Sequence, residues 1–237
     1  MDRCDYDLSS HLLHLAVLAF IVLFALALSR INVVILNLAI DPSGETTPYR
    51  PHPGRNNLAA AATALSFPES QAPAFLALAA GCAFMDRLAE WFIGRAVCHG
   101  HVLAVGAANL FAGLGLIAIG VARLAVPIAP ATGLHILSVG AGGLAIISVF
   151  IIAGLRHTGR DLTVLPWQAH AAIILIIIAC LIRVLPELGL LPGLIGRHYA
   201  LAALFWAAAF GVWLVGFLPF LSRSSREPEP AERESGL

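Results

Sequence analysis

The stretch that decides the fold opens with His135-Ile-Leu-Ser-Val-Gly-Ala-Gly-Gly143 and closes with Ala-Gly-Leu-Arg-His157-Thr-Gly-Arg160. About twenty almost wholly apolar residues lie between its two histidines. At ~1.5 Å per residue they can cross the ~30 Å hydrocarbon core of a bilayer. We therefore expect His135 and His157 near opposite faces of a membrane, where ionisable residues are candidates for a functional role.

The composition of the whole chain supports a membrane protein. Of its 237 residues, 59% are hydrophobic and only 12% are charged, which is too much apolar surface for one soluble core. The spans that the sequence predicts are Leu12–Ala39, Pro73–Ile93, Val102–Ala122, Thr132–Leu155, Val164–Leu185 and Tyr199–Leu221. The sequence therefore predicts an all-α polytopic bundle of about six spans over residues 1–222, followed by a disordered cytoplasmic tail over residues 223–237.

One apolar run, Leu58–Phe67, is too short to span a bilayer and is interpreted as a half-helix or interfacial segment, with a seventh span as the alternative. With six spans, more arginines gather on one face than on the other, which favours both termini in the cytoplasm. A seventh span would move the N-terminus to the opposite face. The net charge is zero and lysine is absent, so a nucleic-acid partner is not expected.

Histidine is abundant for so apolar a chain, with nine copies. Neutral imidazole tolerates a low dielectric and ligates haem iron and copper. His135 and His157 lie too far apart along one helix to bind the same ion, so each needs a partner from another helix. The candidate metal ligands are His99, His101, His135, His157 and His170. The alternative is that histidines at the membrane faces only anchor or cap helices.

Two further features concern packing and charge. The glycines of Gly140-Ala-Gly-Gly143 give their span a strip without side chains, which favours close helix packing over a slot for a flat macrocycle. Charges inside spans are expected to be paired. Arg87 and Glu90 are spaced for such a pair, and Arg183 either snorkels to the interface or meets a haem propionate.

The segments around His135 and Arg156-His157-Thr158-Gly159-Arg160 resemble the sequence pattern of the NnrS family, polytopic bacterial membrane proteins described as binding haem and copper and linked to nitric oxide metabolism. Residues 12 to 222 are similar to the C-terminal six-helix half of such proteins. The resemblance implies a haem b and copper as a second cofactor. The residues that it implies for cofactor binding are His135, His157, Arg160 and Arg183.

The resemblance also implies the bacterial inner membrane, a role in nitric oxide response or denitrification, and redox chemistry at iron or copper if the protein is an enzyme. Association with itself or with another membrane subunit is expected. Two alternatives stay open: a cofactor-free accessory or scaffold subunit of a respiratory complex, and a small transporter with Arg30, Asp86, Glu90 and Arg183 along its path.

Overall fold

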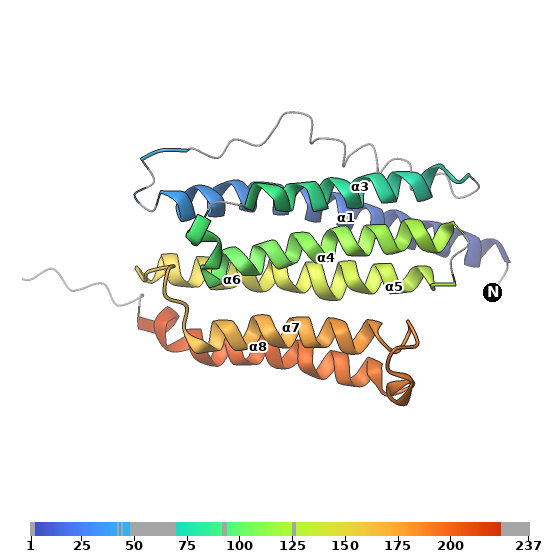
Figure 1. Ribbon diagram of the computed structural model, residues 1–237. Coiled ribbons are helices and arrows are strands. Elements are labelled where there is room, and N and C mark those ends of the chain that lie inside the picture. Colours follow the sequence, from blue (N-terminus) through green and yellow to red (C-terminus); the bar gives the residue numbers. More distant parts are fainter. Residues whose placement is uncertain are drawn as a thin grey trace, which may run out of the picture.

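The structure is a computed structural model that describes residues 3–41, 43, 45–47, 70–91, 94–124 and 127–223. The described part is helical and contains no strand. The helices lie side by side in three layers, with α1 and α3 in the first, α4, α5 and α6 in the second, and α7 and α8 in the third (Figure 1). The prediction of an all-α bundle is confirmed.

The helices follow the expected spans closely. Their bounds are α1 Arg3–Ile40, α3 Ala72–Leu88, α4 Gly100–Arg123, α5 Pro130–His135, α6 Gly143–His157, α7 Trp167–Val184 and α8 His198–Arg223, with short 3-10 segments η2 Ala89–Trp91, η3 Gly94–Cys98 and η5 Pro192–Leu194. Prolines lie in the first turn of α3 and α5, where the missing N–H costs no hydrogen bond.

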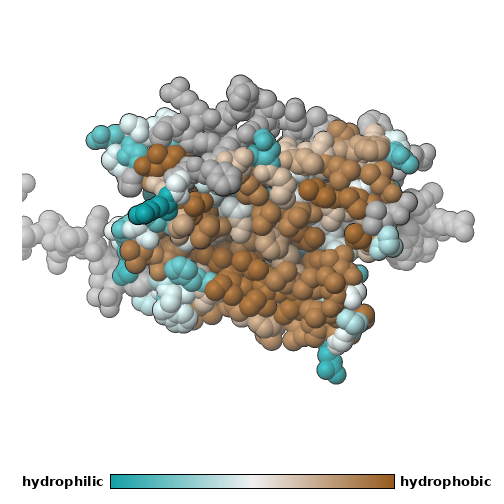
Figure 2. Space-filling view, in the orientation of Figure 1, coloured by the Kyte–Doolittle hydropathy of each residue, from teal (hydrophilic) through white to brown (hydrophobic). Residues whose placement is uncertain are grey.

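A π-helical segment, η4 (Ile136–Gly142), joins α5 to α6, so that residues 130–157 form one rod. Four described helices are long and apolar enough to cross a membrane: Gly100–Arg123, Ala131–His157, Trp167–Val184 and His198–Pro219. Hydrophobic residues cover the face formed by α7 and α8, and hydrophilic residues gather at the ends of the bundle (Figure 2). The protein is an integral membrane protein.

Close contacts between helices depend on residues without a side chain. A Cβ on Gly81 of α3 would lie 2.9 Å from the carbonyl oxygen of Gly113 in α4. A Cβ on Gly140 would lie 2.6 Å from the ring of Phe111 and 2.8 Å from Sγ of Cys180. Side chains of neighbouring helices therefore fill the glycine strip, and the prediction that it serves helix packing is confirmed.

The direction of the first helices differs from the six-span arrangement. Gly120 of α4 lies against Ala74 near the start of α3, and Gly113 lies against Met85 near its end, so α3 runs antiparallel to α4. α1, which contacts α4 through Asn32 and Asn109, runs in the same direction as α3 (Figure 1). Two neighbouring helices that run in the same direction do not fit the strict alternation that the six-span arrangement assumes. The segment 58–67 lies outside the described residues, as does the tail from residue 224 onward.

The arginine count that favoured two cytoplasmic termini assumed strict alternation of six spans. In the structure, the start of α1 and the end of α8 lie at opposite ends of the bundle (Figure 1). Arg3 is therefore at the end opposite to Arg87 and Arg156. Which end faces the cytoplasm stays a prediction.

Candidate functional site

A polar network joins α5, α7 and the turn after α7 at one end of the bundle. Nη2 of Arg183 lies 2.7 Å from Nε2 of His135, and Nη1 of Arg183 donates a hydrogen bond to Oε1 of Glu187. Arginine has no acceptor atom, so Nε2 of His135 accepts this bond and the proton of the neutral ring is on Nδ1. Nδ1 in turn lies 3.4 Å from Oε2 of Glu187.

Glu187 is the centre of this network. Besides the bond from Arg183 to Oε1, Glu187 accepts a hydrogen bond at Oε2 from the hydroxyl of Thr132, at 3.0 Å. Partial burial alone would raise the pKa of Glu187, but the hydrogen bonds from Arg183 and Thr132 and the charge of Arg183 outweigh it and lower the pKa below 4.5. Glu187 is therefore a carboxylate at neutral pH, and it balances the charge of Arg183.

Two aromatic rings from the start of α8 cover the network. The guanidinium of Arg183 lies 3.9 Å from the centre of the Tyr199 ring, a cation–π arrangement. His198 packs on the same tyrosine at 4.2 Å between ring centres, and its Nε2 is 4.0 Å from Oε1 of Glu187. His198 is 5% exposed, and neither of its ring nitrogens has a hydrogen-bond partner among the described residues.

The network gives Arg183 a role that the sequence analysis did not assign. Arg183 is 6% exposed, so it does not snorkel to the interface, and its guanidinium is held by Glu187 and His135. The signal that was available in the sequence is the spacing of Arg183 and Glu187, four residues apart, which suits an ion pair on one helical face. Thr132 and His198 carried no such local signal, because their partners lie on other helices.

The opposite end of the bundle holds the segment His157-Thr158-Gly159-Arg160. It forms a Schellman helix end: Arg160 N donates to the carbonyl of Leu155 at 2.9 Å, and Gly159 N donates to that of Arg156 at 3.1 Å. Gly159 has a φ of +65°, which a residue with a Cβ rarely adopts. His157 is thus the last residue of α6. After the turn, Arg160 and Asp161 lie near His99 and His101 at the start of α4, with which they line a cavity.

An apolar groove lies between α1 and α6 on this side of the molecule. Its volume is about 560 Å³, and its walls are Ile31, Val34, Ile35, Val149, Ile152 and Ala153. Three basic side chains, Arg30, Arg156 and His157, complete its lining. Arg30 and Arg156 form no ion pair within the described part of the chain. An apolar slot with two cationic groups and an imidazole suits an amphipathic, anionic ligand.

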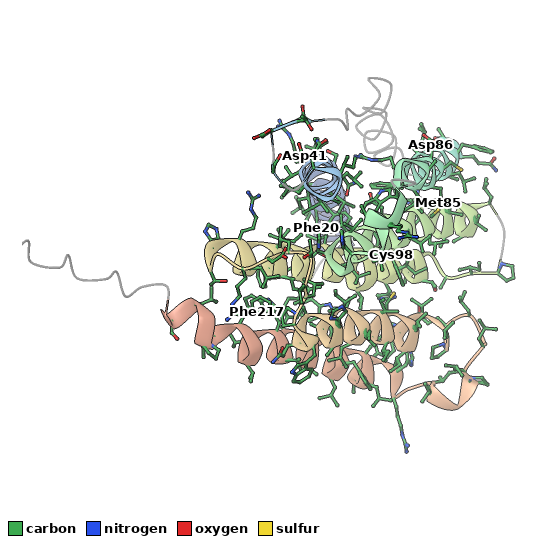
Figure 3. All side chains as sticks on the ribbon, turned by 60° about the vertical axis from the view of Figure 1, so that its left-hand side comes forward. Phe20, Asp41, Met85, Asp86, Cys98 and Phe217 are labelled. Carbon is green, nitrogen blue, oxygen red and sulfur yellow. The ribbon has the colours of Figure 1, made fainter. Side chains whose placement is uncertain are left out.

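A second, more polar cavity adjoins the groove, and Arg156 lines both. Its volume is about 300 Å³, and it is lined by Leu38, Ala39, His99, His101, Arg156, Arg160, Asp161, Leu162 and Thr163. The end of the bundle that holds it comes forward in Figure 3, where Asp41 marks the end of α1 and Cys98 the end of η3.

Two histidines of this cavity lie next to each other. Their rings are nearly parallel, at 9°, with 5.7 Å between ring centres. His99 precedes α4 with an extended backbone and His101 lies in the first turn. Nδ1 of each ring is buried and has no hydrogen-bond partner among the described residues, and His101 is only 3% exposed.

The four residues predicted to bind a cofactor are thus divided between the two ends. His135 and Arg183 contact each other at one end, while His157 and Arg160 lie at the other. His170 is exposed at the start of α7, where its Nδ1 is 3.3 Å from the carbonyl of Pro166. The bundle therefore does not bring these residues into one site.

The groove fits a haem better than the network does. Haem b has an apolar ring, two propionates and an iron that takes an imidazole ligand, and the groove supplies apolar walls, two arginines and His157. In the network, Nε2 of His135 already accepts a hydrogen bond from Arg183. For copper, the described residues hold no group of three or more His, Cys, Asp or Glu side chains placed to bind a metal.

Comparison with known proteins gives one family. The model of a family described as NnrS protein matches residues 3–225, nearly the whole chain. No curated protein and no solved structure gives a significant match.

Proposed function

The chain belongs to the NnrS family, and on that premise we propose that it is a haem b protein of the bacterial inner membrane that acts in the response to nitric oxide or in denitrification. When bound, the haem would supply one-electron and ligand-binding chemistry at its iron. The residues of this chain would hold it, balance its charge and keep water from its ring. Copper stays a second candidate cofactor.

One observation carries the proposal: the groove between α1 and α6 places an imidazole and two guanidiniums around an apolar slot of about 560 Å³. His157 is the residue that would ligate the haem iron, because its side chain is exposed and lines the groove at the end of α6. Arg30 and Arg156 are the partners for the propionates, which are otherwise costly to bring near the bilayer.

The local structure supports this use of His157. The Schellman turn fixes the last residues of α6, and the hydroxyl of Thr158 donates to the carbonyl of Gly154 at 2.7 Å. The backbone that carries His157 is therefore defined on its C-terminal side. The aliphatic side chains of α1 and α6 form the dry walls that an apolar ring requires.

The test is the haem content of full-length protein purified in lipid nanodiscs, read from the reduced-minus-oxidised spectrum and an iron assay. We expect haem in the wild type and at least about a tenfold loss of affinity in His157→Ala, because iron ligation contributes several times the ~1.4 kcal/mol that a factor of ten requires. His170→Ala is the matched control, since His170 is exposed at the same end but does not line the groove.

A His157→Ala variant with full haem content would refute the assignment of the ligand. A colourless wild-type protein would refute haem binding itself. In that case, co-purification with other membrane subunits would support the accessory-subunit alternative, and solute flux in liposomes would support the transporter.

A further inference from the structure

The polar cavity beside the groove takes no part in the ligation of haem by His157, and its lining combines two arginines, two histidines and an aspartate. Four separate parts of the chain contribute to it: the end of α1, the start of α4, the end of α6 and the turn that follows α6. From these parts we infer that the cavity binds an anionic oxygen group of single negative charge, such as a carboxylate.

The charges of the lining support an anion. Arg156 and Arg160 are the cationic residues, and Asp161 is the acidic one. Hydrogen bonds from the side chain and backbone of Thr163 lower the pKa of Asp161, which keeps it ionised at neutral pH. Leaving the histidines aside, the two guanidiniums and the one carboxylate give the lining one positive charge in excess, which suits one negative charge better than two.

Unsatisfied nitrogens in the lining point to a ligand independently of these charges. Nδ1 of His99 and Nδ1 of His101 are both buried without a hydrogen-bond partner in the described structure. The whole residue His101 is only 3% exposed. Buried polar atoms in folded proteins are almost always hydrogen-bonded. The ring of His101 also interacts with the backbone of Leu162, another lining residue. An oxygen anion would accept hydrogen bonds from the guanidiniums and from an imidazole N–H of the lining.

The anionic group has two sources with the same chemistry. It can be a small free anion, or it can be the charged end of a ligand whose apolar part lies in the groove. The second source rests on the proposed function, because the groove ligand would then be haem b with a propionate in the polar cavity. Arg156 lines both the groove and the polar cavity, so one ligand could place its apolar part in the groove and its charged end in the cavity. We therefore favour the second source over a free anion.

The first experiment measures binding of formate by calorimetry to the full chain in nanodiscs, prepared without haem. We expect Arg160→Gln to raise the Kd about tenfold, the loss of one charge-assisted hydrogen bond. We expect Asp161→Asn, a change of similar shape at an exposed position, to lower the Kd about threefold. Sulfate should bind more weakly than formate, and Arg197→Gln, exposed at the opposite end, should change nothing.

The second experiment compares the uptake of haem b with that of its dimethyl ester, which lacks propionate charge. A preference for haem b that Arg160→Gln removes identifies the propionate as the anion. Equal uptake of both, together with formate binding that depends on Arg160, identifies a free anion. Failure of all haem uptake refutes the proposed function, and the formate result then still decides the anion site.

The inference is overturned if formate binds equally to the wild type, Arg160→Gln and Asp161→Asn, or to none of them, while haem b and its ester are taken up alike. Asp161→Asn keeps the test decisive if Arg160→Gln does not fold, because the expected gain in affinity requires folded protein.

Discussion

Nη2 of Arg183 lies 2.7 Å from Nε2 of His135, so residues 48 positions apart join α7 to the rod of α5 and α6. Glu187 holds the same guanidinium from the other side. Two of the four residues that the family resemblance assigned to a cofactor are therefore, in this structure, parts of one ion-paired network between helices.

Replacing Glu187 by Gln should destabilise the protein. The change leaves the guanidinium of Arg183, 6% exposed, without its carboxylate, and we expect a loss of about 2 kcal/mol in the free energy of unfolding. Equilibrium unfolding of the full chain in mixed micelles measures it. Arg197→Gln, an exposed change near the same end, is the control, and an equal effect of both variants would show that the network contributes nothing.

The carboxylate of Asp41, just after α1, should titrate at an unusually low pH. Hydrogen bonds from the side chains of Ser43 and Thr46 and from the backbone N–H of Thr46 lower its pKa from 3.8 to about 2. Because the folded pKa is depressed, this stabilisation of the turn is present above pH 3.8 and is lost as the pH falls through about 2.

The pKa of Asp41 can be read directly from the carboxyl ¹³C shift of labelled aspartate. Thr46→Val removes one of the hydrogen bonds to Asp41, and it should move the midpoint back toward 3.8. A wild-type midpoint already near 3.8 would show that the turn does not form in solution.

Asn32 and Asn109 should stabilise the contact between α1 and α4 as a pair. Each amide donates to the oxygen of the other at 3.0 Å, and both side chains are buried. We expect each single change to Ala to cost about 1 kcal/mol and the double mutant to cost less than the sum, because each change removes the cross-helix partner of the other amide. In Asn32→Ala, Nδ2 of Asn109 keeps its hydrogen bond to the carbonyl of Val105, at 2.8 Å. A double-mutant cycle in mixed micelles tests this, and additive effects would argue against the pair.

Gly81→Ala should weaken the packing of α3 on α4. The new Cβ would lie 2.6 Å from Cγ1 of Ile117 and 2.9 Å from a backbone oxygen, and backbone cannot move aside cheaply. We expect a loss of about 1–3 kcal/mol. Gly211→Ala is the matched control, because no atom lies within 4 Å of its added Cβ, and it should be neutral or gain up to ~1 kcal/mol from helix propensity. Thermal unfolding that ranks the two variants in the opposite order would contradict the packing.

The sequence by itself determined the class of the protein and the extent of most helices. The predicted span Val164–Leu185 became α7 at Trp167–Val184, and Val102–Ala122 became α4 at Gly100–Arg123. These bounds are readable because the hydropathy of each residue reports locally whether it lies in lipid or at the interface. The NnrS pattern around His157 likewise sufficed to identify the family that the comparison confirmed.

Only the tertiary structure decided which of these apolar helices are neighbours and in which direction they run. All the spans are similarly hydrophobic, so hydrophobicity alone does not decide which helices pack against each other. That choice depends on close fits such as Gly81 against α4 and on single polar contacts such as Asn32 with Asn109. The parallel direction of α1 and α3, the contact of His135 with Arg183, and the groove at His157 beside the polar cavity are seen only in the folded bundle. Contacts between residues far apart in the chain leave no periodic signal in the sequence, and for that reason the site could not be assembled from it.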